Sequence, residues 1–366
     1  MVLGALFLTA GSMGCGDSAG DGPGGGGAAG GAGGATGTGG TAAGGSATEV
    51  FAWQEIPLGV DSPAARSAYG FVYHAAEQRS YLAGGQPAGP VPIADTWLYE
   101  NDAWTEVPID GGDLDARKSM RIVYDSARER LVSFGGIYGG LVVEPEWSDA
   151  TRVFENGAWT ELVVEGDKPS PRSAYGMAYD EERDRVVLFG GGNNVDVFGD
   201  TWEFDGTSWE QRSPSTEPMP RYHPRMVYDP IGKRSLLFGG NHLEPFNDLW
   251  AWDGTDWTEV TPDGDAPAPR NRAAATWDEK RHRMLIYGGT TTYPPFIDET
   301  NTFADMWAYD GESWQLLSSD EGPGLRMGTQ MVYEPNTDRV LLFGGSMDGS
   351  SSVHDMWSFA PHAPMD

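Results

Sequence analysis

Six arginines recur along the chain at intervals of 49 to 56 residues, and a Gly-Gly pair begins 18 residues after each of them. The arginines are Arg66, Arg117, Arg172, Arg221, Arg270 and Arg326. A guanidinium group holds a carboxylate or phosphate through a fork of hydrogen bonds. A ring of six such groups would therefore suit an anionic ligand.

Aspartates repeat with the same period and support a second interpretation. In five units an aspartate stands two residues before a tryptophan; these are Asp95, Asp200, Asp248, Asp305 and Asp355. The second unit has only Asp149, displaced by one position. Each arginine would then pair with a carboxylate or a loop carbonyl of its own or a neighbouring unit. We favour this pairing, because a binding site needs asymmetry and these residues repeat.

The segments between the arginines and the Gly-Gly pairs predict short antiparallel strands. Residues 174–179 and 185–189 alternate or concentrate apolar side chains on either side of a polar turn. Further on, Asp205-Gly206 predicts a two-residue hairpin turn, which would place Trp202 opposite Trp209. The same seven-residue spacing of tryptophans recurs in three other units. Each unit of about 50 residues therefore predicts four strands, here called A to D.

The double glycine, the spaced aromatics and the paired tryptophans resemble the Kelch repeat, and the resemblance covers roughly residues 51–359. It implies an all-β, six-bladed Kelch-type β-propeller. The sixth unit ends without a second tryptophan, and the segment around Trp53 has the spacing to supply it. We therefore expect residues 51–56 to complete the last blade and close the ring, which removes the exposed sheet edges.

Recognition is expected on the face that carries the arginines, the Gly-Gly pairs and the B to C loops. These loops vary from 10 to 18 residues, whereas the spacing from arginine to Gly-Gly is constant. The longest loop contains Tyr293 and Phe296, which could stack on a sugar or anchor a peptide, or could only pack the loop down. His223 and His242 belong to the same face, but no ligand spacing enforces a metal site, and we predict none. Asp298, Glu299 and Asp305 lack the ordered spacing of an EF-hand calcium loop.

Enzyme chemistry has little support in the sequence. The copper radical chemistry of galactose oxidase, whose central domain is Kelch-like, needs a tyrosine crosslinked to a cysteine, and the only cysteine here is Cys15. We expect no cofactor. A Kelch-like sialic-acid mutarotase needs only a few polar side chains at the channel mouth, so a carbohydrate-active enzyme stays open as the alternative.

The N-terminus predicts export. Residues 2–14 form an apolar run that is too short to span a bilayer but fits the core of a secretory signal. The run leads to Ser12-Met13-Gly14-Cys15, which resembles the lipobox of bacterial lipoproteins, although no Lys or Arg precedes it and Ser12 stands where leucine is usual. An ordinary secretory signal is the alternative. We expect a signal over 1–15, a flexible Gly/Ala-rich tether over 16–48, the propeller over 49–360 and a tail over 361–366.

A net charge of −30 excludes nucleic acid as an expected partner, since such a surface repels phosphate backbones. The sequence thus predicts a monomeric binding or scaffold module of the cell envelope, an outer-membrane lipoprotein or a secreted protein. Its partner would be an extracellular or periplasmic protein or glycan, and its membrane contact would be through the lipid anchor only.

Overall fold

Short runs rich in β-branched and aromatic residues form the strands of this protein, and the second strand of every blade ends at a Gly-Gly pair. The computed structural model describes residues 49–89, 91–108, 116–139, 144–292, 296–319 and 322–362. These residues belong to one compact unit. The predicted signal, tether and Cys15 lie outside the described residues.

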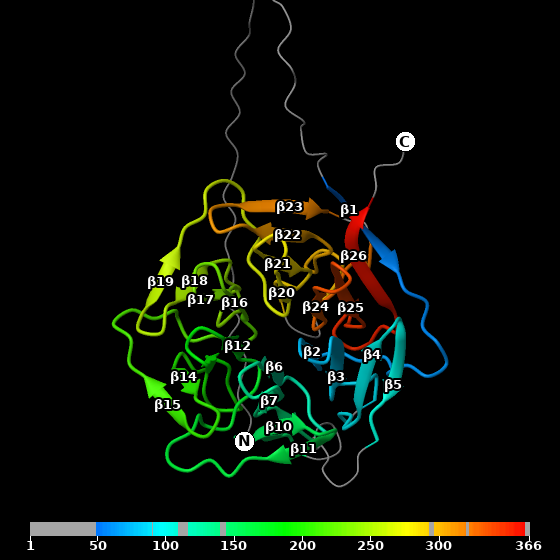
Figure 1. Ribbon diagram of the computed structural model, residues 1–366. Coiled ribbons are helices and arrows are strands. Elements are labelled where there is room, and N and C mark those ends of the chain that lie inside the picture. Colours follow the sequence, from blue (N-terminus) through cyan, green and yellow to red (C-terminus); the bar gives the residue numbers. More distant parts are fainter. Residues whose placement is uncertain are drawn as a thin grey trace, which may run out of the picture. The chain divides into compact units, whose positions relative to one another are not determined.

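Six four-stranded antiparallel sheets radiate from a common centre, as Figure 1 shows, with strand A innermost and strand D outermost. Blade one contains β2 (Gly70–His74), β3 (Arg79–Ala83), β4 (Thr96–Glu100) and β5 (Ala103–Glu106). Blade two contains β6 (Arg121–Asp125), β7 (Arg130–Phe134), β10 (Thr151–Glu155) and β11 (Ala158–Glu161), and its B to C loop forms the ribbon of β8 (Ile137–Tyr138) and β9 (Glu146–Trp147). Blade three contains β12 (Gly176–Asp180), β13 (Arg185–Phe189), β14 (Thr201–Phe204) and β15 (Trp209–Arg212).

The other three blades repeat the arrangement. Blade four contains β16 (Arg225–Asp229), β17 (Arg234–Phe238), β18 (Leu249–Trp252) and β19 (Trp257–Val260). Blade five contains β20 (Ala274–Asp278), β21 (Arg283–Tyr287), β22 (Met306–Tyr309) and β23 (Trp314–Ser318). Blade six contains β24 (Gln330–Glu334), β25 (Arg339–Phe343) and β26 (Met356–His362), and its outer strand is β1 (Val50–Glu55).

The pairing of β1 with β26 closes the ring, which confirms the predicted fold class and closure. Trp53 lies opposite Phe359, and Glu55 lies opposite Trp357. The two ends of the propeller chain thus share one sheet, visible as the blue and red strands in Figure 1. β1 covers the outer side of β26, so blade six has four strands like the other five blades.

The core lies between the blades. Each of the six hydrophobic clusters draws buried side chains from two adjacent blades, and one of them joins Phe343 and Met356 of blade six to Tyr69 and Trp104 of blade one. Each blade therefore buries the apolar faces of its sheet against the two neighbouring blades, so the core depends on the closed ring.

The Gly-Gly pairs join each blade to the next. The amide of the second glycine donates to the carbonyl of the following blade's arginine at all six junctions, including Gly345 to Arg66 across the closure. At the second junction, a Cβ on Gly135 would lie 2.5 Å from the Arg172 carbonyl oxygen, and the φ of Gly135 is +58°. Both the close approach and the backbone angle favour glycine here.

Two local predictions from the sequence were wrong in detail. The first strand of blade three begins at Gly176 rather than Ala174, because Ala174 has a φ of +59°, outside the β region. Trp209 lies opposite Phe204, and Trp202 opposite Gln211. The reason is that the Asp205 carboxylate accepts from the amides of Thr207 and Ser208, which makes the turn two residues longer than predicted.

Candidate functional site: a cationic cavity at the channel mouth

The six repeated arginines are buried, with 0 to 3% of their surface exposed. Five of them form forked ion pairs with an aspartate of their own blade: Arg66 with Asp95, Arg172 with Asp200, Arg221 with Asp248, Arg270 with Asp305, and Arg326 with Asp355. In the fourth blade, the two nitrogen–oxygen distances are 2.6 and 2.8 Å. All six arginines also donate to the carbonyl of the first glycine of their own Gly-Gly pair.

Neighbouring aromatic side chains complete these pairs. In the same five blades, the indole N–H of the tryptophan two residues after the aspartate donates to that aspartate at 2.7 to 2.9 Å. Arg172 lies over the Phe198 ring, with 3.9 Å between the guanidinium carbon and the ring centroid. The second blade departs from the pattern, since Asp149 pairs with Lys168 and Arg117 lies over Tyr138.

In five of the six units this geometry is the Arg–Asp pairing that we favoured over a ring of arginines that binds an anionic ligand. A buried guanidinium requires a partner, and five of the six find theirs in a carboxylate of the same blade. None of the six lines the cavity at the channel mouth. The five arginines thus use their charged groups for contacts within the blade.

That cavity has a volume of about 420 Å³ and lies where the inner strands begin. Its wall contains the residue two positions after each arginine: Ala68, Ser119, Ala174, His223, Arg272 and Gly328. All six have a φ between 54° and 64°. Five of the six junctions carry a backbone hydrogen bond from one of these residues to the next, for example from the His223 amide to the Ala174 carbonyl at 2.6 Å. A ring of hydrogen-bonded backbone thus holds the side chains around the channel.

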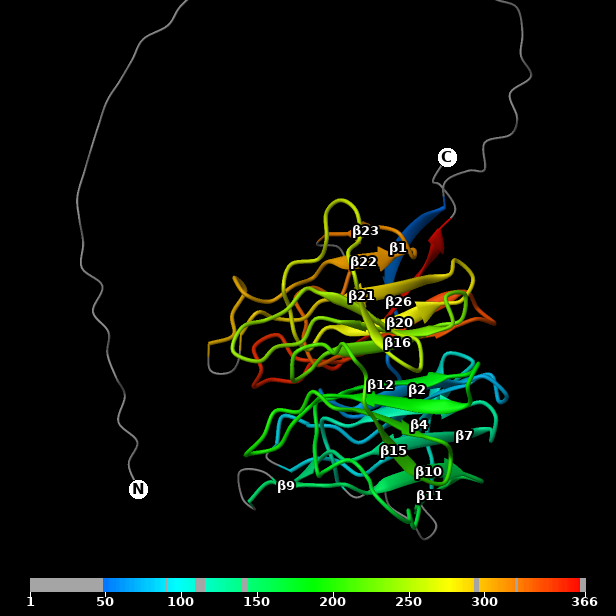
Figure 2. The same cartoon turned by 90° about the vertical axis from the view of Figure 1, so that its left-hand side faces the viewer.

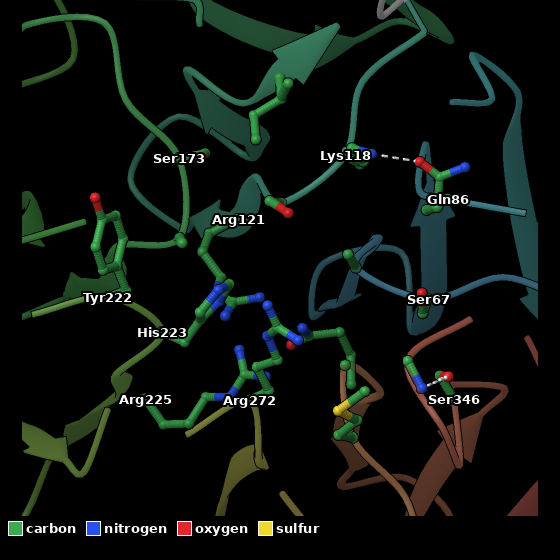
Figure 3. Close-up of a pocket in the computed structure, with 18 of the residues that line it drawn as sticks. Ser67, Gln86, Lys118, Arg121, Ser173, Tyr222, His223, Arg225, Arg272 and Ser346 are labelled. Carbon is green, nitrogen blue, oxygen red and sulfur yellow. Dashed lines mark hydrogen bonds between the residues drawn. The ribbon is translucent and has the colours of Figure 1, made fainter. Parts of the chain in front are cut away.

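Cationic side chains converge in this cavity. Arg121 and Arg225 stand four residues after their repeat arginines, and Lys118 stands one residue after Arg117. Figure 3 shows Arg121, Arg225, Arg272 and His223 directed toward one another. The described residues that line the cavity include no aspartate or glutamate. The cavity is therefore positively charged, in a chain whose net charge is −30.

The environment of the cavity shifts the proton affinities of its basic groups. Burial lowers the pKa of Arg121 to about 10. The pKa of His223 is held well below its usual value, first by burial and then by the charges of Arg272 and Arg121. Burial also lowers the pKa of Lys118, whose ammonium donates to the Gln86 side chain at 2.6 Å. His223 is therefore neutral at pH 7 beside three arginines.

Sequence reasoning identified His223 but missed the three arginines of the cavity. For Arg121 and Arg225 the signal was available in the fourth position after each repeat arginine, where the units carry Gly70, Arg121, Gly176, Arg225, Ala274 and Gln330, whereas Arg272 stands two residues after Arg270. Large polar residues alternate there with glycine or alanine. A position inside a propeller that varies in this way breaks the sixfold symmetry, as a binding site requires.

Exposed apolar side chains stand around the cavity face, one in each of five B to C loops: Val91, Val195, Leu243, Phe296 and Met347. Phe296 is 73% exposed and Leu243 is 89% exposed. In Figure 2 the longer loops extend to the left of the sheets and the short A to B turns to the right. Phe296 is thus exposed and does not pack its loop down.

The remaining candidates have separate places. His242 is half-buried in the B to C loop of blade four, outside the cavity wall, and its amide donates to the Glu244 carbonyl. Tyr293 lies outside the described residues. Asp298 accepts from the amide and hydroxyl of Thr300, and Asp305 is the partner of Arg270.

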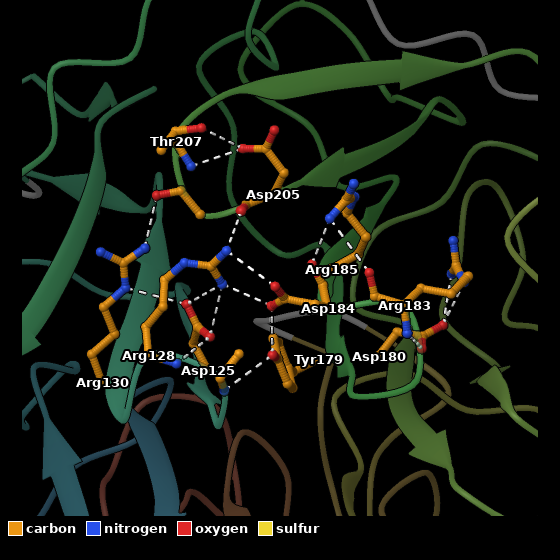
Figure 4. A network of polar contacts seen from close by, with 12 residues as sticks. Asp125, Arg128, Arg130, Tyr179, Asp180, Arg183, Asp184, Arg185, Asp205 and Thr207 are labelled. Atoms are coloured by element: carbon orange, nitrogen blue, oxygen red, sulfur yellow. Dashed lines mark hydrogen bonds and ion pairs between the residues drawn. The ribbon is translucent and has the colours of Figure 1, made fainter.

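The opposite face is held by ion pairs between blades. Arg128 of blade two contacts both Asp125 of its own turn and Asp184 of blade three, as Figure 4 shows. The Arg128 side chain also donates to the Asp205 carbonyl at 2.6 Å. Arg281 and Asp338 form an equivalent contact between blades five and six. These contacts fasten the A to B turns to one another.

The fold and the site together define a closed six-bladed β-propeller with a polar cavity at one end of its channel. The Kelch-repeats domain of the KLHDC2/KLHL20/DRC7 type matches residues 137–315 and, in an overlapping alignment, 231–363. Together these matches cover more than half of the chain, and the protein belongs to this Kelch-repeat family. Kelch propellers typically act as protein-binding modules.

Proposed function

We propose that this Kelch propeller is a binding module that takes a protein or glycan ligand on the face bearing the cavity and the B to C loops. The observation that carries the proposal is the asymmetry of this face. The residues that line the cavity differ from blade to blade, and the surrounding loops each present a different exposed apolar side chain. Apolar groups around a concave polar centre are typical of recognition surfaces.

The proposal includes export and a lipid anchor at Cys15. Its support is the sequence of the N-terminus, in which an apolar run of 13 residues leads to a lipobox-like Ser12-Met13-Gly14-Cys15. In the part of the chain that the structure describes, no helix is long and apolar enough to cross a membrane. We place the propeller in the cell envelope, as an outer-membrane lipoprotein or a secreted protein acting as a monomer.

No specific observation favours the carbohydrate-active alternative. A converging set of carboxylates around a histidine would favour it, since proton transfer to and from a sugar uses such groups. The described cavity wall presents His223 among arginines instead.

The test compares two faces of the full-length chain. Leu243 and Phe296 are replaced together by serine on the cavity face, and Ile231→Ser is the matched control because Ile231 is 63% exposed in an A to B turn of the opposite face. Each protein is applied to a glycan array and used as bait for envelope proteins. Loss of an anchoring apolar contact typically weakens binding by about tenfold or more.

The proposal predicts a ligand that the wild-type and Ile231→Ser proteins retain and that the double variant loses. A ligand lost only by Ile231→Ser would place the functional face on the opposite side. A wild-type protein that retains nothing beyond what an unrelated propeller retains would contradict the binding role itself.

A further inference from the structure

The contacts between neighbouring blades depart from the repeat at the outer part of the junction between blade six and blade one. In three blades, the indole N–H of the strand D tryptophan donates to the threonine that begins strand C of the preceding blade, at 2.8 to 3.0 Å: Trp159 to Thr96, Trp209 to Thr151, and Trp257 to Thr201. In blades four, five and six, strand C begins instead with Leu249, Met306 and Met356. A leucine side chain has no acceptor, and a thioether sulfur is only a weak one.

The strand D tryptophan of blade one, Trp104, has no acceptor for its indole N–H. Its ring faces blade six, with 5.6 Å between its centroid and that of Phe343, and the threonine position of that blade is Met356. Trp104 is 7% exposed, and its Nε1 is buried with no hydrogen-bond partner among the described residues. An unpaired buried donor costs free energy, which an acceptor from outside the chain would offset.

A cavity of about 360 Å³, here called the junction cavity, adjoins this tryptophan. It lies beside the linker that follows β1, drawn in blue in Figure 1, and beside the hairpin of β4 and β5. Its wall includes Ile56, Leu58, Tyr99, Trp104 and Met356. Ligand pockets typically have volumes of about 300 to 1,000 Å³, and they combine a largely apolar wall with a few polar groups. The junction cavity has the size and the wall of a site for a small molecule.

The charged groups of the junction cavity restrict the charge of its ligand. The described residues of its wall include Asp61 and Asp102 but no lysine, arginine or histidine. Arg339 donates to the Asp102 carboxylate at 2.7 Å, and this hydrogen bond holds the pKa of Asp102 below its usual value. Asp102 is therefore ionised at pH 7. A carboxylate ligand such as a fatty acid would be repelled, whereas a neutral molecule would not.

We propose that the junction cavity binds a small neutral molecule that has an apolar body and a carbonyl oxygen, and that this oxygen accepts a hydrogen bond from Trp104 Nε1. The apolar body packs against Ile56 and Leu58. Met356 has an unbranched, flexible side chain, which can change rotamer to admit the oxygen to the indole N–H. The junction cavity is separate from the cavity at the channel mouth, so this inference does not depend on the proposed role of the cavity face.

The experiment compares two probes that differ only in the acceptor. One is 4-fluoroacetophenone, and the other is 4-fluoro-α-methylstyrene, in which a CH₂ group replaces the carbonyl oxygen. Fluorine NMR titrations of the full-length protein give a dissociation constant for each probe. Because the two probes also differ in their hydration in water, the informative quantity is the change in their affinity ratio between wild-type and variant proteins.

Two variants remove the need for a ligand acceptor. Trp104→Phe removes the N–H donor, and Met356→Thr supplies the internal acceptor that Thr96 provides to Trp159. Each should shift the affinity ratio toward the alkene by about threefold to tenfold, the contribution of one neutral hydrogen bond. Met306→Thr is the matched control, since it makes the same substitution at the first residue of strand C in blade five. It should leave the ratio unchanged.

The wild-type protein should bind both probes, and Met356→Thr decides the question should Trp104→Phe not fold. An unchanged ratio in either folded variant overturns the hydrogen bond from Trp104. No binding of either probe to the wild-type protein overturns the site, as would be found for a cavity that holds only ordered water. A ratio that shifts in Met306→Thr and not in Met356→Thr would place the carbonyl at the wrong junction and contradict the assignment.

Discussion

Neutralising Asp248 should destabilise the propeller strongly, because this carboxylate is the counter-charge of a buried arginine. Arg221 is 1% exposed and Asp248 21% exposed, and the pair is joined by two hydrogen bonds. Asp248→Asn keeps the shape of the side chain but removes its charge. The Arg221 guanidinium then remains buried without a counter-charge, and its acceptors are the carbonyls of Gly239 and Met219 and the single amide oxygen of the substituted side chain.

The size of the effect follows from the burial of the pair. Breaking a buried ion pair by removing one partner costs about 3 to 5 kcal/mol. Asp248 keeps some contact with solvent, so we expect the lower end, about 3 kcal/mol, out of a typical folding free energy of about 5 to 15 kcal/mol. Asp149→Asn is the internal control, since Asp149 pairs with Lys168 and both side chains are 39% exposed. Such an exposed pair contributes about 1 kcal/mol or less.

Urea unfolding followed by tryptophan fluorescence measures both variants against the wild-type protein. We expect the midpoint of Asp248→Asn to fall well below that of Asp149→Asn. Equal midpoints for the two variants would refute the conclusion that the repeated Arg–Asp pairs hold the blades. Increased binding of an anion at Arg221 in Asp248→Asn, without loss of stability, would return the repeated arginines to the ligand-binding role.

Three further predictions concern closure, anchoring and pH. Trp53→Ala should lower the free energy of unfolding by about 2 kcal/mol, because Trp53 is half-buried against Tyr287. Trp257→Ala should cost more, about 3 to 5 kcal/mol, because Trp257 is 2% exposed. Equal urea midpoints for Trp53→Ala and the wild type would contradict a closing role for β1. Cys15→Ser should release the protein from the membrane fraction into the soluble envelope fraction, and unchanged fractionation would contradict the lipid anchor. The folded protein should become less stable as the pH falls below about 6.5, because His223 takes up a proton there in the unfolded chain but not in the folded protein. Arg121, Arg225 and Arg272 face His223 from three blades. His223→Gln should reduce the change of the urea midpoint between pH 7.5 and 5.5, and an unchanged pH dependence would contradict the prediction.

The sequence predicted the architecture because the repeated residues are the contacts between and within the blades. Arg172 is an example, since its side chain ties together the first Gly-Gly carbonyl and Asp200 of its own blade, while its carbonyl accepts from Gly136 of the blade before. Three constraints on one residue fix both its identity and its spacing. The closure of the ring could also be predicted from the sequence, because Trp53 occupies the position of a strand D tryptophan.

The candidate site was less predictable, because its residues are set by what does not repeat. Arg121 and Arg225 occupy positions that hold glycine in blades one and three, and no single unit shows that these side chains meet. Their proximity depends on the sixfold arrangement of the inner strands about the channel. The repeated arginines are the most regular feature of the sequence, and their regularity reflects a structural role in the ion pairs of the blades.

The most direct test of the claim that the cavity face is the recognition surface is hydrogen–deuterium exchange of the full-length protein, with and without a ligand recovered from the glycan array or the pull-down. Slower exchange of the bound protein in the B to C loops that carry Leu243 and Phe296 is the predicted result. Slower exchange confined to the A to B turns, such as the turn that carries Ile231, would contradict the claim.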